Sequence, residues 1–196
     1  MKIIYFMGKS ASGKDTVYKK IKEQIEPKPL EIVLYTTRPR RDNEENGREY
    51  YFVTKDEIRC IEREGKVIEK RIYNTVYGEW IYMTADDGQF KSECNYIAIG
   101  TLESYMKIKK YFGEEVMVPI YLEVEDGMRL ERAIEREKTQ KIPKYEEMCR
   151  RFLADQQDFA EEKLEEAGIR VRFANVDVCK CIQYIKEYLS CKLLEK

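Results

Sequence analysis

The chain has 196 residues, of which 43% are hydrophobic and 37% charged, and its 36 Lys and Arg nearly balance its 37 Asp and Glu, giving a net charge of −1. This composition predicts one soluble globular domain and gives no basic field for nucleic acid and no apolar run long enough to span a membrane. The absence of His excludes Ser-His-Asp and Cys-His catalysis. The 6 Cys form no C-x2-C pair and are expected to be reduced, and without the pattern of a signal peptide we expect a cytoplasmic protein.

The first predicted elements are a buried strand over 2–7 and a helix over 14–25, joined by the loop Gly8-Lys9-Ser10-Ala11-Ser12-Gly13-Lys14. The spacing Gly-x4-Gly-Lys between a strand and a helix is that of a phosphate-binding loop, although a plain strand–helix turn is the simpler alternative. Glycines let backbone N–H groups turn toward phosphate oxygens, and Lys14 adds a full positive charge. Asp15 stands where a Mg²⁺-ligating Ser or Thr is usual, with Thr16 next, so Asp15 is the candidate ligand for Mg²⁺.

Further along the chain we predict a strand over 30–34, a polar loop over 36–48, a strand over 50–53, and a helix that Thr54 caps with Glu57 in a capping box. Strands over 67–73 and 76–83 follow, joined by a turn at 74–75, and then a short helix or loop over 85–91. The remaining elements are a strand over 96–99, a helix over 101–112, a strand over 116–122 in which Pro119 indicates an edge or a bulge, a helix over 126–137, a long helix over 144–167, a strand over 170–174 and a helix over 178–194.

Apolar strands that alternate with helices predict an α/β fold, a parallel sheet with helices on both faces. Ligands bind such sheets at the carboxyl ends of the strands. The loop at 8–14, Arg38 after the strand over 30–34, Gly100 and Asn175 are therefore expected at one edge. The segment 36–83 interrupts the alternation and is a candidate inserted subdomain beside the phosphate loop.

A second informative stretch covers residues 36–53 and is rich in Arg, Glu and Tyr. Arg38 and Arg41 can grip a second phosphate through their guanidinium forks, and the phenolic groups of Tyr50 and Tyr77 can bond to the same phosphate. A solvated charged loop beside an ordinary sheet is the alternative for the same residues.

Glu69 lies in an otherwise apolar predicted strand, where its carboxylate can accept from two N–H groups of a guanine edge. With this residue, with Tyr77-Gly78, and with Thr-Thr-Arg-x-x-Arg followed by Glu-x-x-Gly-x-x-Tyr-x-Phe-Val over 36–53, the chain resembles guanylate kinases over nearly its whole length. The resemblance implies three parts: a P-loop NTPase core with a parallel sheet (1–34, 84–136 and 150–196), an inserted mixed α/β acceptor-nucleotide-binding subdomain (35–83) and a helical lid (137–149). It also implies transfer of the γ-phosphoryl group of ATP to GMP or dGMP with Mg²⁺, with no indication of an oligomeric state.

The resemblance implies roles for individual residues as well. The expected GMP-binding residues are Thr36, Arg38, Arg41, Tyr50, Glu69, Tyr77 and Glu79. The expected ATP-binding residues are Gly8, Lys9, Ser10, Ala11, Ser12, Gly13, Lys14, Asp15, Thr16 and Asn175. The expected catalytic residues are Lys14, Arg38, Arg132, Arg136 and Arg151, although on spacing alone the helical arginines are ordinary solvated charges.

Three positions differ from the family pattern. Asp15 replaces the hydroxyl after the lysine, Glu79 stands where the family has Ser or Thr, and Gly100 stands where it has an Asp near the guanine. The loss of that Asp leaves Glu69 as the remaining acidic base reader. Two alternatives stay open: a related kinase with another phosphorylated acceptor, such as a different nucleotide or ribose bisphosphate, and a non-catalytic domain that binds nucleotide or protein. The complete phosphate loop favours an enzyme.

Overall fold

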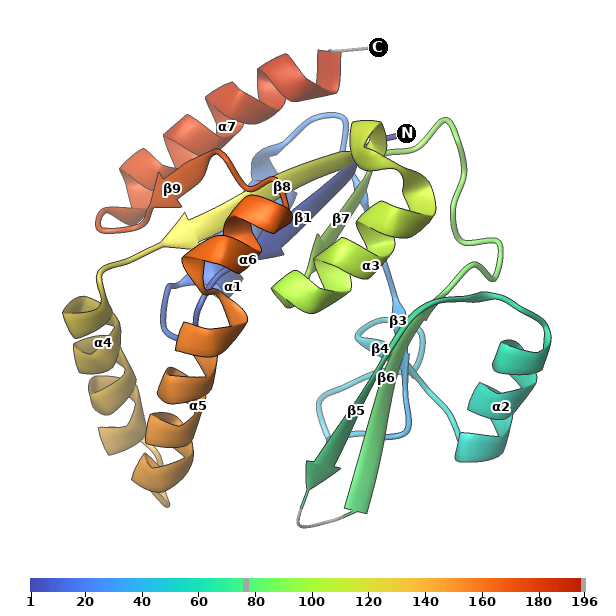
Figure 1. The fold of residues 1–196 in the computed structure, drawn as a ribbon, viewed down its shortest axis with the longest axis horizontal. Helices are drawn as coiled ribbons and strands as arrows, with labels where there is room; N and C mark the ends of the chain where they lie inside the picture. Colours follow the sequence, from blue (N-terminus) through green and yellow to red (C-terminus); the bar gives the residue numbers. More distant parts are fainter. Residues whose placement is uncertain (76–77, 195–196) are drawn as a thin grey trace.

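The computed structural model describes residues 1–75 and 78–194, which form two sheets and the helices around them (Figure 1). The larger sheet is parallel, with the strand order β2-β7-β1-β8-β9. Its strands are β1 (Ile3–Met7), β2 (Leu30–Glu31), β7 (Tyr96–Ile99), β8 (Met117–Glu123) and β9 (Arg172–Ala174).

Helices cover both faces of the parallel sheet, as the strand sequences require. Alternate residues of β1 point to opposite faces: Tyr5 packs with one cluster of buried residues and Phe6 with the other. The first cluster includes residues of α3 (Leu102–Phe112) and α6 (Glu161–Glu166), and the second includes residues of α1 (Lys14–Gln24) and α7 (Val178–Leu194). A strand buried on both sides is apolar throughout, which explains the Ile-Ile-Tyr-Phe-Met run.

The smaller sheet has the order β4-β3-β6-β5 and is mixed, because β3 and β4 are parallel while β6 is antiparallel to both β3 and β5. One helix packs against it through a small core that includes Ile58, Ile81 and Met83. The elements are β3 (Leu34–Thr36), β4 (Tyr50–Phe52), α2 (Lys55–Arg63), β5 (Val67–Thr75) and β6 (Gly78–Ala85). The predicted capping box is present, since the Glu57 N–H donates to Thr54 Oγ1 at 3.2 Å and the Thr54 N–H donates to Glu57 Oε2 at 2.7 Å.

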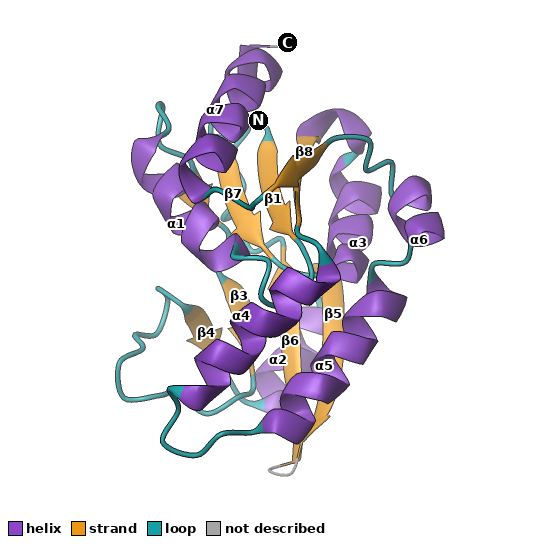
Figure 2. Ribbon diagram, turned by 90° about the vertical axis from the view of Figure 1, so that its left-hand side faces the viewer, coloured by secondary structure: helices purple, strands orange, loops and turns teal. Residues whose placement is uncertain are grey.

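Two helices, α4 (Asp126–Lys138) and α5 (Tyr145–Asp158), form an antiparallel pair after β8, and a short 3-10 turn (Glu114–Val116) precedes β8. Figures 1 and 2 show that this pair and the smaller sheet both extend from the same side of the parallel sheet and face each other. The predicted α/β architecture, a parallel sheet with helices and a separate mixed sheet, is thus confirmed. The division into core, acceptor-binding subdomain and lid stays a prediction.

Two predictions in the first half of the chain are wrong. The predicted strand over 30–34 is two short strands, because β2 pairs with β7 in the large sheet whereas β3 pairs with β4 and β6 in the small one. Arg38 therefore follows a strand of the mixed sheet and not of the parallel one. The predicted turn at 74–75 is also wrong, since Asn74 pairs with Glu79 and Thr75 with Gly78 within the hairpin. Periodicity alone does not locate either boundary, because both depend on which strand lies alongside.

Two later predictions also need correction. β8 is an interior strand between β1 and β9, but β9 pairs only with residues from Tyr121 onward, so at Pro119 only β1 lies alongside. This one-sided position accounts for a proline inside the sheet. The predicted helix over 144–167 is broken at Phe159–Ala160 into α5 and α6, because the Phe159 side chain is buried against Tyr121. All six cysteines are free, and no helix within 1–75 and 78–194 has both the length and the apolarity for crossing a membrane.

We predict that Ile120→Ala lowers the free energy of unfolding by about 2–5 kcal/mol, because it removes a side chain that is 0% exposed in the centre of the parallel sheet and leaves a cavity. Leu194→Ala is the control, since Leu194 is 82% exposed, and a change within about 0.5 kcal/mol is expected there. Urea unfolding followed by circular dichroism measures both. Equal losses in the two variants would contradict the assignment of the core.

Candidate active site

The phosphate loop leaves β1 at Met7 and enters α1 at Lys14, at the carboxyl edge of the parallel sheet. Gly13 has φ 81°, and a Cβ atom there would lie 2.5 Å from Asn175 Nδ2. A Cβ atom at Gly8 would lie 2.7 Å from the Leu122 carbonyl oxygen. Both glycines are therefore required by close approach of neighbouring elements as well as by the turn.

Asn175, which follows β9, holds this loop. Its side chain is buried, and Nδ2 donates to the Ser12 carbonyl at 2.7 Å. Its own backbone carbonyl accepts from Arg132 Nη2 at 3.0 Å, which ties α4 to the same place. Within the part of the chain that the structure describes, Asn175 Oδ1 and Ser12 Oγ are buried without a hydrogen-bond partner. Buried polar atoms of this kind usually have a partner, so their presence fits a polar ligand at the loop.

Lys14 and Asp15 form the start of α1. Lys14 Nζ lies 4.0 Å from the Asp15 carboxylate, which is 77% exposed. No cluster of three possible metal ligands occurs among the residues described. Mg²⁺ at phosphate sites is commonly held by one or two carboxylates together with substrate phosphates and water, so a single exposed carboxylate fits Mg²⁺ that arrives with a nucleotide. The assignment of Asp15 to that role stays a prediction.

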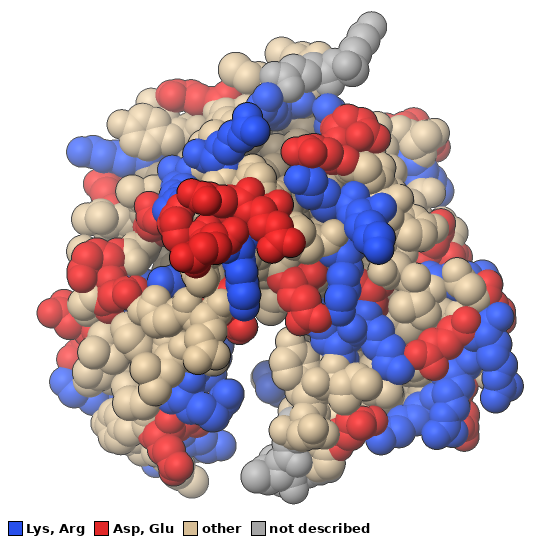
Figure 3. Space-filling view, in the orientation of Figure 1, with Lys and Arg blue, Asp and Glu red and all other residues tan. Residues whose placement is uncertain are grey.

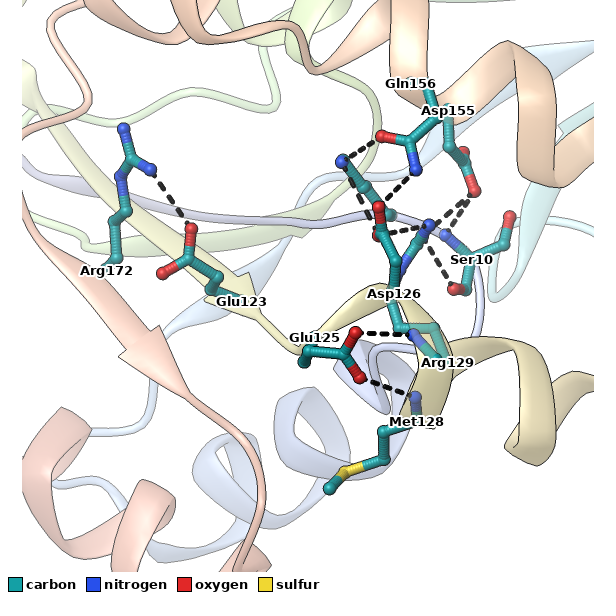
Figure 4. A network of polar contacts seen from close by, with 11 residues as sticks. Ser10, Glu123, Glu125, Asp126, Met128, Arg129, Asp155, Gln156 and Arg172 are labelled. Carbon is teal, nitrogen blue, oxygen red and sulfur yellow. Dashed lines mark hydrogen bonds and ion pairs between the residues drawn. The ribbon is translucent and has the colours of Figure 1, made fainter.

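Arg129 of α4 is a residue that the sequence analysis missed (Figure 4). Its guanidinium is fully buried; Nε donates to Asp126 Oδ1 at 3.1 Å and Nη1 to the Ser10 carbonyl at 3.2 Å. Nη1 also lies 3.5 Å from Asp155 of α5, whose Oδ2 accepts from the Ser10 N–H at 2.7 Å. One guanidinium thus joins the phosphate loop to both helices of the pair. The spacing of Asp126 and Arg129, three residues apart on a helix, is the signal that could have revealed it.

Lys9, a residue of the phosphate loop, extends the same network to Gln156 and Asp126. Its Nζ donates to Gln156 Oε1 at 2.5 Å and lies 3.8 Å from Asp126. Gln156 Nε2 in turn donates to Asp126 Oδ2 at 2.5 Å. Since Lys9 is engaged with these helices, the structure assigns it to holding α5 against the loop, while Lys14 is the loop lysine without a short hydrogen bond among the described residues.

Arg38, which follows β3 of the smaller sheet, is buried. It donates from Nη2 to Glu44 Oε1 at 2.7 Å, and its guanidinium lies 5.5 Å from the centre of the Tyr50 ring. Thr36 is buried beneath it and accepts from the Arg38 N–H at 3.1 Å, so Thr36 shapes the backbone. Glu44 Oε2 accepts from the Arg41 N–H at 2.9 Å, which places the two arginines on one carboxylate.

This geometry shifts two pKa values. The hydrogen bond from Arg38, together with the N–H of Arg41, holds the pKa of Glu44 below its ordinary value. Burial lowers the pKa of Arg38, but the hydrogen bond and charge of Glu44 outweigh it and raise the pKa above the ordinary value. Arg38 and Glu44 therefore remain a charged pair at neutral pH.

The helix pair and the segment that carries the smaller sheet both contribute arginines to the space between them. One cleft of about 1540 Å³ is lined by Arg41, Tyr50 and Arg151 among others, and an adjoining cavity of about 470 Å³ by Ser10, Arg41, Arg136 and Arg151. Arg151 Nη2 reaches Ser10 Oγ at 3.3 Å. Figure 3 shows this hollow with basic side chains on both walls. The structure thus brings the phosphate loop, Arg41 and two of the helical arginines together.

Two of the remaining predicted residues, Glu69 and Glu79, are engaged by other side chains of the fold. Glu69 is 0% exposed and already bonded to Arg71 and to Thr84. Glu79 forms an exposed ion pair with Lys55 of α2 at 3.0 Å. Tyr77 lies outside the described residues.

Gly100 lines the cleft, but the space beside it is filled. A Cβ atom at this position would collide with the Tyr5 hydroxyl, which is hydrogen-bonded to Ser104. Burial raises the pKa of Tyr5 to about 12, although the Ser104 hydrogen bond opposes it, so the phenol is neutral. An aspartate does not fit here without movement of Tyr5.

A parallel sheet that presents a Gly-x4-Gly-Lys loop to an arginine-lined cleft defines an α/β protein of the P-loop nucleotide-binding class. A family model described as Guanylate kinase matches residues 1–85. The guanylate kinase of Porphyromonas gingivalis is 25% identical over 193 residues, 96% of each chain, and that of Bacteroides thetaiotaomicron is 31% identical over 119 residues, 59% of this chain and 56% of its own. The crystal structure of guanylate kinase from Anaplasma phagocytophilum shares the fold, with a TM-score of 0.62 over 100% of this chain and 87% of its own at 20% identity. The chain is thus similar to guanylate kinases in the sequence of its amino-terminal part and in its fold, and to one of them over nearly its whole length.

We predict that Glu44→Gln makes stability less sensitive to acid. The folded-state pKa of Glu44 lies below its unfolded value, so its stabilisation is fully present above the unfolded pKa of about 4.3 and is lost as the pH falls through the folded pKa. Gln does not titrate. Urea unfolding of both chains near neutral pH and at about pH 3.5 is expected to show the smaller loss for Glu44→Gln. Identical losses would mean that the ion pair with Arg38 does not form in solution.

Proposed function

We propose that this protein transfers the γ-phosphoryl group of ATP to GMP or dGMP, giving ADP and GDP or dGDP. The observation that carries the proposal is that Ser10 of the phosphate loop, Arg41 of the acceptor side, and Arg136 and Arg151 of the helix pair line one cavity. A donor phosphate on the loop and an acceptor phosphate at Arg41 would meet there. The family model that matches residues 1–85 and the relative named guanylate kinase that matches over 96% of this chain support the same reaction.

The reaction requires alignment and charge neutralisation more than covalent help from the protein. An oxygen of the acceptor phosphate forms a bond to the γ-phosphorus while the bond between that phosphorus and the β–γ bridging oxygen breaks, and ADP leaves. The acceptor is already an oxyanion, so no general base is needed, which suits a chain without His. Lys14, Arg136 and Arg151 supply positive charge where the transferred group passes.

Mg²⁺ bound to the nucleotide would neutralise phosphate charge, and Asp15 would hold it. The backbone of the loop binds the donor phosphates, and the network of Arg129 keeps α4 and α5 in a fixed relation to that loop.

One observation favours a different phosphorylated acceptor as the second candidate. Gly100 has no acidic side chain, and Glu69 does not line the cleft, so neither carboxylate of a guanine site faces the acceptor. A nucleotide with another base, or ribose bisphosphate, is therefore the alternative acceptor. A non-catalytic nucleotide-binding domain is the third candidate and conflicts with the complete loop.

The acceptor screen tests these candidates directly. Purified protein with ATP and Mg²⁺ is offered GMP, dGMP, AMP, CMP, UMP or ribose 1,5-bisphosphate, and ADP release is followed. We predict turnover with GMP and dGMP, and a loss of about 10²–10³-fold in kcat for Lys14→Ala, whose fold is checked by thermal unfolding. Turnover with a non-guanine acceptor alone would reject the proposal, and nucleotide binding without any turnover would favour the non-catalytic candidate.

Arg41→Ala tests the acceptor phosphate site. Loss of a charged hydrogen bond to the acceptor phosphate is expected to raise the KM for GMP about tenfold or more, with the KM for ATP unchanged. Arg40→Ala is the matched control, because Arg40 is the exposed neighbour on the same loop and does not line the cleft. Steady-state kinetics with each substrate varied in turn give both constants. The same acceptor KM in both variants would remove Arg41 from the site.

A further inference from the structure

Arg71, on β5, lines the cleft in which Glu69 was expected to bind the base. Its Nε donates to Glu69 Oε2 at 3.0 Å and its Nη2 donates to Glu69 Oε1 at 3.2 Å. The carboxylate therefore forms a bidentate pair with the Nε–Nη2 edge of the guanidinium. Thr84 Oγ1 donates to the same carboxylate at 2.9 Å. Glu69 is 0% exposed, whereas Arg71 is 11% exposed and lines the large cleft. The acceptor therefore meets a donor group where a carboxylate was predicted.

Arg71 keeps N–H groups that its pairing with Glu69 does not use. A guanidinium has five N–H groups, and Glu69 uses one on Nε and one on Nη2. The other Nη2 hydrogen and the two on Nη1 remain, and they make up the end of the fork. No residue of the described part of the chain accepts from Nη1. A pair of parallel donors of this geometry matches two adjacent acceptor atoms.

The surroundings of Arg71 favour a flat, neutral ligand. Tyr50, Tyr73 and Tyr82 line the cleft with it, and the Tyr73 and Tyr82 rings lie 5.6 Å apart in an edge-on arrangement. Aromatic walls suit a nucleobase. The positive charge of Arg71 is balanced by buried Glu69, which favours the neutral edge of a base over a second phosphate.

Guanine carries two adjacent acceptors, O6 and N7, and the commonest specific contact of Arg with guanine is a bidentate pair to these atoms. Adenine offers N7 as an acceptor but carries an amino donor at position 6. This amino group would face an N–H group of the guanidinium, so no hydrogen bond forms between them. The closed space beside Gly100 adds no carboxylate that would select the N1 and 2-amino donors of guanine.

We propose that Arg71 is the base-reading residue of the acceptor site and that it recognises the O6 and N7 edge of 6-oxopurine monophosphates, with the 2-amino group left unrecognised. The inference rests on the proposed phosphoryl transfer to GMP and names the part of the acceptor that is selected. GMP and IMP are then comparable acceptors, in contrast to a site in which Glu69 binds the N1 and 2-amino groups.

Base analogues test this on the unaltered protein. Compared with GMP, kcat/KM is expected to stay within about fivefold for IMP, which has O6 and N7 but no 2-amino group, and to fall roughly tenfold or more for 7-deaza-GMP and for AMP. Titration calorimetry of the same monophosphates gives the affinities independently of turnover. A loss above about 100-fold for IMP, with 7-deaza-GMP equal to GMP, would overturn the role of Arg71.

The two proposals fail in different ways. If GMP binds without being phosphorylated, the proposed function is rejected, whereas the order of the analogue affinities still decides how the base is read. If GMP is phosphorylated but IMP is not, the function stands and Arg71 is not the reader.

Arg71→Lys provides a second test, because lysine keeps the charge opposite Glu69 and loses the fork. The KM for GMP is expected to rise about 5- to 150-fold with a smaller change in kcat, and the preference for GMP over 7-deaza-GMP is expected to disappear. Lys70→Ala is the control, since Lys70 lies on the opposite face of β5 and pairs with Glu62 at 2.7 Å. Thermal unfolding confirms that both variants fold. An unchanged KM and an unchanged analogue preference in Arg71→Lys would show that Arg71 only pairs with Glu69 and does not read the base.

Discussion

The buried guanidinium of Arg129 is the contact on which the geometry of the cleft depends. It bonds to the carbonyl of Ser10 and lies against Asp126 and Asp155, which belong to two different helices. A buried charge is costly unless it is paired and hydrogen-bonded, so these partners are held close to it. The phosphate loop cannot shift without moving α4 and α5, and the arginines that these helices carry stay aligned with the loop.

The side of the cleft that carries the smaller sheet is built on the same principle, with two guanidinium–carboxylate pairs. Arg38 pairs with Glu44, and Arg71 pairs with Glu69. Burial lowers the pKa of Arg71, but the charge of Glu69 outweighs it and leaves the pKa raised, so the cation persists. Such pairs add little net stability, because desolvation offsets the attraction. Their effect is positional: each carboxylate uses some donors of its arginine and thereby fixes the direction of the others.

Local pattern predicts what local forces determine. The strand, the glycine loop and the first helix follow from residues 2–25, and the loop lies where the sequence places it. The strand predicted over 30–34 is wrong because its two halves pair with different sheets, which no local pattern reveals. The engagement of Glu69 was predictable in part, since residues i and i+2 of a strand share a face and place Arg71 beside it. The further hydrogen bond from Thr84 to Glu69, and the burial of the pair, are seen only in the structure.

The hydroxyl of Tyr5 in the space beside Gly100 links two positions that are 95 residues apart in the numbering and in contact in the fold. An aspartate introduced at Gly100 alone collides with the phenol, and a smaller residue at Tyr5 alone leaves an empty, buried volume beside Ser104. Each single change is unfavourable, while the two together are compatible. The two positions are therefore energetically coupled, and the effect of a substitution at one of them depends on the residue that stands at the other.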